Sequence, residues 1–141
     1  MLANIDNRDS VATPGILAHN TVILVDDDEA VRDSLRVLLE LRGHVVEDFG
    51  SAEDCIARGH PDAAGCLVVD FHMPVTNGLG LIRSLRDNGI PIPAILISGA
   101  MTPMIRREAE SLHLSGVFEK PCDNNLLLDA IDRVLAEPTA S

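Results

Sequence analysis

Thr21-Val-Ile-Leu-Val25, followed at once by Asp26-Asp27-Asp28, is the stretch of sequence that decides the fold. A short apolar run rich in β-branched residues predicts a strand buried on both faces, as in a parallel sheet covered by helices. Apolar residues then recur at helical spacing up to a glycine suited to end a helix: Val31, Leu35, Leu38, Leu39 and Gly43. One strand followed by one helix is the repeating unit of an α/β fold.

The same unit recurs along the rest of the chain. Further strands are expected at 44–49, 66–69, 92–97 and 116–119. The helices between and after them are expected from Ser51 to Gly59, through Leu81 to Leu85, from Thr102 to His113, and from Asp123 to Ala136. Five strand-helix pairs in strict alternation predict a doubly wound, five-stranded parallel sheet with five helices in a single domain.

Composition and charge restrict the possible functions. The 141 residues carry 22 Asp+Glu against 11 Lys+Arg, and no basic cluster interrupts the net charge of −11. Direct contact of this chain with nucleic acid or with an anionic membrane surface is therefore not expected. Cys55, Cys66 and Cys122 form no disulfide or zinc pattern, which is typical of a reducing cytosol. The sequence also shows no signal peptide and no apolar run of membrane-spanning length, so we expect a cytoplasmic protein.

Polar side chains follow four of the five expected strands. Asp26 and Asp27 come after the first strand, Asp70 after the third, Ser98 after the fourth and Lys120 after the fifth. Ligands of doubly wound folds bind at these carboxyl ends. Crowded carboxylates repel one another, and a hard cation such as Mg²⁺ relieves that repulsion. A carboxylate beside the cation can attack a phosphoryl group while the lysine and the hydroxyl neutralise its charge.

Each of these residues also has a simpler interpretation. An acid after a buried strand often only caps the next helix, a lysine before proline is commonly a surface charge, and a serine before glycine commonly forms a turn. Asp70 is harder to explain in this way, because it directly follows the apolar run Leu67-Val-Val69, where burial of a charge is costly. The joint occurrence of all five at one edge of the sheet favours phosphoryl transfer.

The same residues resemble a known family. The chain is similar to the receiver domains of bacterial two-component response regulators over about residues 21–136. The matching segments, in chain order, are Val22–Glu29, Leu67–Pro74, Asn77-Gly78, Ile97–Ala100 and Glu119–Pro121. The resemblance implies a flavodoxin-like sheet with strand order 2-1-3-4-5 and a role in phosphorelay signal transduction.

The resemblance also implies a role for each matching residue. Asp70 corresponds to the phosphoacceptor, Asp27 to the acid that binds Mg²⁺ directly, and Asp26 to the acid that acts mainly through water. Ser98 corresponds to the hydroxyl that hydrogen-bonds the phosphoryl group, and Lys120 to the lysine that pairs with it. Such a domain catalyses only its own phosphorylation and dephosphorylation and is not otherwise an enzyme.

Two points stay open at this stage. The run Asp26-Asp27-Asp28 leaves a register ambiguity of one residue, and we favour 26 and 27 because they directly follow the apolar run. The backbone carbonyl of His72 resembles the remaining protein ligand of Mg²⁺. The His72 side chain either lies beside the phosphoryl group and tunes its hydrolysis or faces solvent.

The chain departs from the family pattern in three places. Val117 stands where the family often has an aromatic residue that moves with the serine, while Phe118 is expected to face the opposite side of its strand. Cys122 replaces a frequent phenylalanine after the Lys-Pro pair. The segment 75–78 differs from the commoner Gly-hydrophobic-Asp-Gly loop, which should alter loop stability more than chemistry.

The resemblance implies a histidine kinase or a phosphotransfer protein as the phosphodonor. Phosphorylation is expected to shift the face formed by residues 102–136, which offers charges of both signs for a possible homodimer. Two alternatives are a phosphorylation-independent pseudo-receiver and a Mg²⁺-dependent aspartyl-phosphate hydrolase. The complete acid-Ser-Lys set argues against the first, and His72, in place of a second acid two residues after Asp70, argues against the second.

The expected domain organisation is simple. Residues 1–20 predict a flexible leader, 21–136 the receiver domain and 137–141 a short tail. No DNA-binding or enzymatic output domain is expected within these 141 residues. The chain is therefore expected to be either a stand-alone regulator or a fragment of a longer transcription factor.

Overall fold

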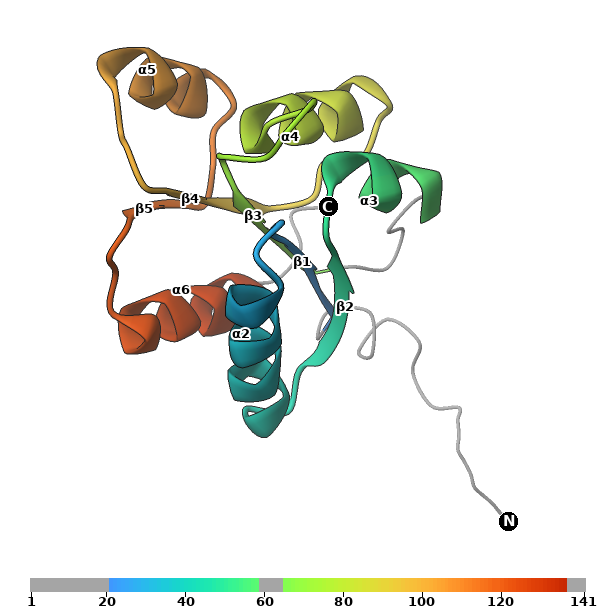
Figure 1. Cartoon of the computed structure of the whole chain (residues 1–141), viewed down its shortest axis with the longest axis vertical. Coiled ribbons are helices and arrows are strands. Elements are labelled where there is room, and N and C mark those ends of the chain that lie inside the picture. The colour runs from blue at the N-terminus through green and yellow to red at the C-terminus, as the bar shows by residue number, and fades with distance from the viewer. Residues whose placement is uncertain (1–20, 59–64, 137–141) are drawn as a thin grey trace.

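The computed structural model describes residues 21–58 and 65–136, and these form alternating strands and helices (Figure 1). The strands are β1 (Thr21–Val25), β2 (Val45–Phe49), β3 (Cys66–Asp70), β4 (Ala94–Ser98) and β5 (Gly116–Glu119). The helices are α2 (Glu29–Leu41), α3 (Ala52–Arg58), α4 (Gly78–Asp87), α5 (Pro103–Ser111) and α6 (Asn124–Ala136). The expected leader and tail, and Gly59 at the end of the second expected helix, lie outside the described residues.

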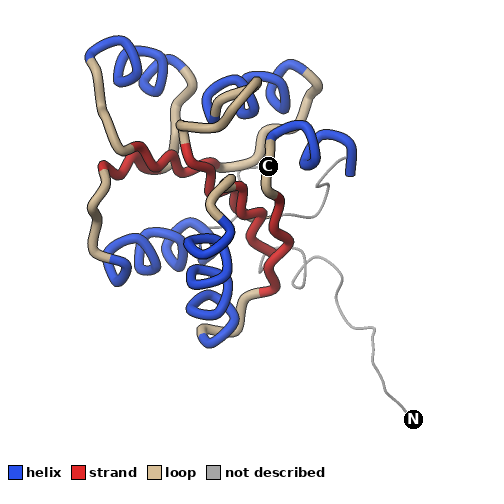
Figure 2. The backbone as a smooth tube through the Cα atoms, viewed as in Figure 1, coloured by secondary structure: helices blue, strands red, loops and turns tan. Residues whose placement is uncertain are grey.

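The five strands form one parallel sheet in the order β2-β1-β3-β4-β5. Helices α3, α4 and α5 lie on one face of the sheet, and α2 and α6 lie on the other (Figures 1 and 2). The predicted fold class, helix number and strand order are confirmed. Because β1 and β3 are neighbours, the acids that follow them end at the same edge of the sheet.

Local sequence explains where the helices begin. The Asp28 side chain accepts hydrogen bonds from the backbone N–H groups of Ala30 and Val31, and so caps α2. Thr102 caps α5 in the same way, with Pro103 in the first turn, where its missing N–H costs nothing. These caps fix the helix starts that the sequence predicted.

Three strands differ from their predicted bounds by one or two residues, and the start of the fourth differs most. The fourth strand was expected from Ile92, but β4 begins at Ala94. Pro91 and Pro93 have no N–H to donate to a neighbouring strand, so regular pairing starts only after them. Ile92 is nevertheless buried and belongs to the core.

The core consists of one apolar layer on each face of the sheet. The layer beneath α3, α4 and α5 includes Val25, Leu67 and Leu96, and the layer beneath α2 and α6 includes Leu24, Val68 and Ile131. All five residues of β3 are buried, as expected for a central parallel strand. None of the described helices has the length and apolarity needed to cross a membrane.

Val117, which stands where the family often has a mobile aromatic residue, and its neighbour Phe118 face opposite sides of the sheet, as predicted. Phe118 packs against the layer under α2 and α6. Val117 is 37% exposed and borders α5, where it lines a small cavity together with Arg106 and His113. The one aromatic residue of β5, Phe118, therefore faces away from α5.

Candidate functional site

Three carboxylates converge at the carboxyl ends of β1 and β3. One oxygen from each of Asp26, Asp27 and Asp70 lies within 4.8 Å of the others. Asp26 and Asp70 are only 2% and 5% exposed, whereas Asp27 is exposed. This arrangement leaves one side of the cluster open to solvent and two carboxylates inside the protein.

Burial makes this cluster electrostatically costly. The pKa of Asp26 is raised above its ordinary value, chiefly by burial and also by the nearby charges of Asp70 and Asp27. A hydrogen bond from the N–H of Asp28 to Asp26, with N···O 2.9 Å, acts in the opposite direction. A divalent cation would relieve the repulsion, and oxygen donors suit Mg²⁺. The residues at this site therefore fit a hard cation.

The acidic run divides into residues with different roles. The carboxylate of Asp28 accepts the hydrogen bonds that cap α2, and Asp28 is not part of the three-acid cluster. Arg32, one turn further along α2, donates a 2.6 Å hydrogen bond to the backbone carbonyl of Asp26 and pairs with Asp48 on β2. These contacts hold the turn after β1 in place beneath the carboxylates.

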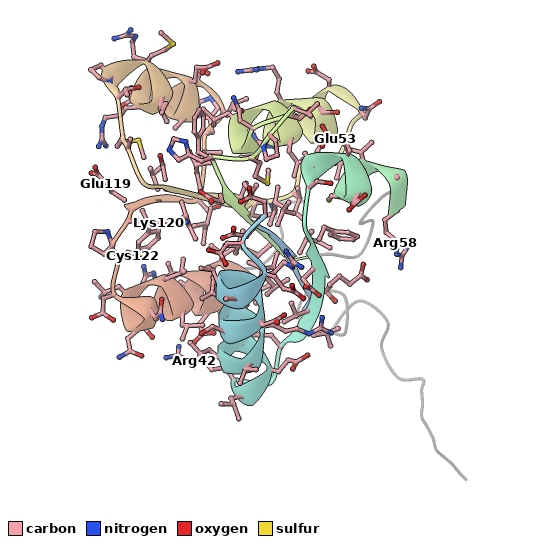
Figure 3. The ribbon with its side chains drawn as sticks, in the orientation of Figure 1. Arg42, Glu53, Arg58, Glu119, Lys120 and Cys122 are labelled. Atoms are coloured by element: carbon pink, nitrogen blue, oxygen red, sulfur yellow. The ribbon has the colours of Figure 1, made fainter. Side chains whose placement is uncertain are left out.

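Lys120 directly follows β5, the strand at one edge of the sheet (Figure 3). Its Nζ lies 3.2 Å from Oδ2 of Asp70. Partial burial lowers the pKa of Lys120, but the hydrogen bond and the charge of Asp70 outweigh that effect and raise the pKa above its usual value. Its backbone N–H also donates to the carbonyl of Ser98, with N···O 2.8 Å, so the two ends of β4 and β5 are tied together.

Ser98 lies at the end of β4, next to β3, and is fully buried. Its hydroxyl donates to the carbonyl of Ala100 at 2.8 Å and accepts from the Ala100 N–H at 3.2 Å. The Nε2 of His72 lies 3.3 Å from the same oxygen. The backbone N–H of His72 donates to Oδ1 of Asp70, with N···O 3.3 Å. His72 thus contacts both the acid and the serine.

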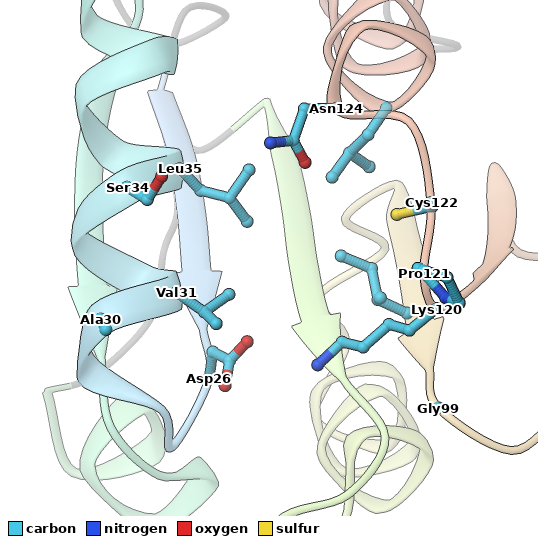
Figure 4. Close-up of a pocket in the computed structure, with 12 residues that line it drawn as sticks. Asp26, Ala30, Val31, Ser34, Leu35, Gly99, Lys120, Pro121, Cys122 and Asn124 are labelled. Atoms are coloured by element: carbon cyan, nitrogen blue, oxygen red, sulfur yellow. The ribbon is translucent and has the colours of Figure 1, made fainter.

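A cavity of about 600 Å³ opens beside these residues, between α2 and α6 (Figure 4). Asp26 and Lys120 face each other at one end, and Leu35 and Leu127 line its apolar wall. Cys122, which stands where the family often has phenylalanine, also lines this cavity. A volume of this size is accessible to small molecules.

The thiols of Cys55, Cys66 and Cys122 are expected to differ in reactivity because they differ in burial. Cys55 and Cys66 are buried, which raises the pKa of their thiols to about 11 and about 12. Cys122 is partly exposed. In the folded protein, a thiol reagent such as dithionitrobenzoate should label one equivalent rapidly, and that equivalent should be lost in Cys122→Ser. Rapid labelling of three equivalents without denaturant would contradict this expectation.

Three features of the site were not predicted from the sequence. Gly78 packs so closely on β3 that an added Cβ would lie 2.6 Å from the backbone oxygen of Asp70. The contact of the His72 side chain with Ser98 and the support of Arg32 beneath Asp26 were also missed. Gly78 carried a signal, since glycine after Asn77 opens a helix where a good helix former would otherwise be preferred. His72 had been singled out by its place two residues after Asp70; it is exposed, and its ring contacts Ser98.

Comparison with known proteins agrees with this geometry. The family model described as the response regulator receiver domain matches residues 22–132. The chain is 37% identical over 113 residues to the transcriptional regulatory protein FixJ of Rhizobium meliloti, covering 80% of this chain and 55% of FixJ. It is 34% identical to TdiR of Thauera aromatica, covering 83% of this chain and 52% of TdiR. The chain therefore spans about half the length of these curated relatives.

Solved structures show the same fold. The crystal structure of FixJ-N superposes with a TM-score of 0.74 at 37% identity and covers 86% of this chain and 97% of that one. The non-phosphorylated HemR receiver domain from Leptospira biflexa gives a TM-score of 0.80 at 21% identity, covering 86% of this chain and 98% of that one, and supports the fold alone. From its sequence match, its topology and its relatives, the chain belongs to the response regulator receiver domain family.

Proposed function

We propose that this domain accepts a phosphoryl group on Asp70 from a phosphohistidine of a histidine kinase or phosphotransfer protein. The observation that carries this proposal is the cluster of Asp26, Asp27 and Asp70, with the Lys120 ammonium 3.2 Å from the Asp70 carboxylate. A buried acid between other acids and a lysine is arranged to hold a cation and an added phosphoryl group. Membership of the receiver family supports the same role.

Asp70, Lys120 and Ser98 have separate roles in the transfer. A carboxylate oxygen of Asp70 forms the new O–P bond while the N–P bond of the donor imidazole breaks. Lys120 neutralises charge on the phosphoryl oxygens, and Ser98 hydrogen-bonds one of them after turning from Ala100. Mg²⁺, when held by Asp27, Asp70, the His72 carbonyl and, through water, Asp26, supplies further neutralisation of the phosphoryl charge.

The added charge is expected to change the face of α5, β5 and α6. Ser98 is joined through Ala100 to the loop that leads into α5, and through its carbonyl to Lys120 after β5. A movement of Ser98 therefore displaces both segments together. This face, within residues 102–136, would act on a partner of the response regulator or on a second copy of the chain, in the cytoplasm where phosphorelay partners occur.

Intact-mass measurement tests the proposal. Incubation of the chain with acetyl phosphate and Mg²⁺ should add one phosphoryl group, which is lost at alkaline pH as expected of an acyl phosphate. Asp70→Asn should show no adduct, because an amide cannot form the acyl phosphate. Addition of EDTA should also prevent the adduct. A full adduct in Asp70→Asn would refute the acceptor assignment.

A matched control separates loss of the acceptor from loss of folding. Asp33 lies on α2 and is exposed, so Asp33→Asn removes one carboxylate away from the cluster. This variant should be phosphorylated as fast as the unaltered chain. Circular dichroism of Asp70→Asn should match that of the unaltered chain, since the amide has the same shape as the carboxylate.

A further inference from the structure

The hydroxyl of Ser98 is fully committed to protein partners. A serine hydroxyl has one proton to donate and two lone pairs to accept with. The proton goes to the Ala100 carbonyl at 2.8 Å, and one lone pair accepts from the Ala100 N–H at 3.2 Å. Because the only proton of Ser98 is used, the contact with Nε2 of His72 at 3.3 Å fits an N–H of the imidazole donating to the second lone pair.

Because Ser98 is buried, the loss of any of these three hydrogen bonds should be costly. Ser98 is 0% exposed, so water cannot easily replace a partner that is lost. Two of the partners are backbone groups of Ala100, two residues further along the chain, so they do not depend on the identity of a side chain. The third comes from His72, on a different segment, and depends on one side chain. His72 is therefore the adjustable part of this arrangement.

The imidazole is held in place by its own neighbours. Its ring packs edge-on against Phe71, with ring centroids 5.0 Å apart and an interplanar angle of 85°. The backbone N–H of His72 donates to Oδ1 of Asp70, which holds the backbone that carries the ring. His72 is an exposed residue, yet its ring already contacts Ser98 without any bound ligand.

We propose that the His72 side chain is a positioning residue of the switch, which holds the Ser98 hydroxyl toward Ala100 and opposes its rotation toward a phosphoryl group on Asp70. This inference rests on the proposed function, because it assumes that Ser98 hydrogen-bonds the phosphoryl group. Rotation of Ser98 then exchanges the His72 and Ala100 contacts for one phosphoryl oxygen. Removal of the His72 contact lowers the cost of that exchange and favours the phosphorylated conformation.

Beryllofluoride with Mg²⁺, a phosphoryl mimic that binds acceptor carboxylates, provides the test. The full chain, His72→Leu and His72→Gln are titrated with beryllofluoride at saturating Mg²⁺, after the Mg²⁺ affinity of each has been measured separately. His72→Leu removes the donor and should bind beryllofluoride about threefold to tenfold more tightly, the effect of one neutral hydrogen bond. His72→Gln retains an N–H at a similar reach and should restore the affinity of the unaltered chain toward its original value.

Amide NMR gives a readout that a purely structural role would not change. The Ala100 N–H donates to Ser98 and so reports on the position of that hydroxyl. Without beryllofluoride, the Ala100 amide peak of His72→Leu should move toward the position of the beryllofluoride-bound unaltered chain. The His72→Gln peak should stay near the free position. In the Ser98→Ala background, His72→Leu and His72→Gln should bind beryllofluoride equally.

The outcomes separate this inference from the function on which it rests. If the unaltered chain binds no beryllofluoride, both the proposed function and the inference fail. If it binds, but His72→Leu and His72→Gln have equal affinity, only the inference fails. Weaker binding by His72→Leu than by the unaltered chain would also overturn the inference, because it would show that His72 supports the bound state instead of opposing it.

Discussion

Gly78→Ala should lower the free energy of unfolding by about 3 kcal/mol, near the upper end for insertion of one methyl group into a packed site. The added Cβ would lie 2.6 Å from the backbone oxygen and 3.1 Å from the backbone carbon of Asp70, and 3.0 Å from Cδ1 of Leu96. Leu96 can move its side chain, but the Asp70 carbonyl is fixed by the sheet. Either α4 or the end of β3 must therefore shift.

Urea denaturation monitored by circular dichroism measures this effect. Gly99→Ala is the matched control, because its added Cβ meets no atom within 4 Å, and its stability should change by less than about 0.5 kcal/mol. Gly78→Ala should also be phosphorylated more slowly by acetyl phosphate, since a shift of β3 displaces the Asp70 carboxylate. Equal stability of Gly78→Ala and the unaltered chain would show that α4 can move away from β3 at little cost.

Asp26→Asn should have opposite effects on stability with and without Mg²⁺. Without the cation, the variant should be more stable than the unaltered chain by about 1 kcal/mol, a typical size for one substitution. The buried charge is removed, whereas the asparagine Oδ1 can still accept the N–H of Asp28. At a Mg²⁺ concentration 100 times its Kd, the unaltered chain should gain about 2.7 kcal/mol, and the variant should lose much of that gain.

The pH dependence of the stability difference between Asp26→Asn and the unaltered chain gives a second measure of the cost of the buried Asp26 charge. Burial raises the pKa of Asp26 in the folded state above its ordinary value of 3.8. The ionised form is therefore disfavoured by folding, and the penalty develops as pH rises from 3.8 to the raised pKa. Without Mg²⁺, the stability advantage of Asp26→Asn should be constant above the raised pKa of Asp26 and should shrink as pH falls from that pKa to 3.8.

Thermal and urea unfolding with MgCl₂ or EDTA measure both effects. Asp33→Asn again serves as the control, since it removes an exposed carboxylate and should respond to Mg²⁺ as the unaltered chain does. A variant Asp26→Asn that is less stable than the unaltered chain in EDTA would contradict the electrostatic account. An undiminished response of this variant to Mg²⁺ would exclude Asp26 from the cation site.

The agreement between sequence and structure is closest where local rules act alone. Apolar runs such as 21–25 predict buried strands, and Thr102-Pro103 predicts a helix start, because each depends only on neighbouring residues. The carboxyl ends of parallel strands must meet at one edge, so the sequence alone predicts that Asp26, Asp70 and Lys120 lie close together.

The agreement is weaker where an outcome depends on contacts between distant segments. The run Asp26-Asp27-Asp28 left its register open, because only the start of α2 decides which carboxylate becomes the cap. Ile92 has the pattern of a strand residue, but whether it pairs depends on the prolines around it and on the neighbouring strand. The contact between His72 and Ser98 joins two loops that share no local pattern.

The sequence by itself determined the class of fold, the order of its elements and the set of acids, hydroxyl and ammonium at one edge. It could do so because periodicity and strand direction are properties of short segments. Only the tertiary structure decided that Gly78 has no space for a methyl group, that Ser98 is held by His72, and that Cys122 borders a cavity. Those features depend on distances between side chains and backbones that meet only when the helices pack on the sheet.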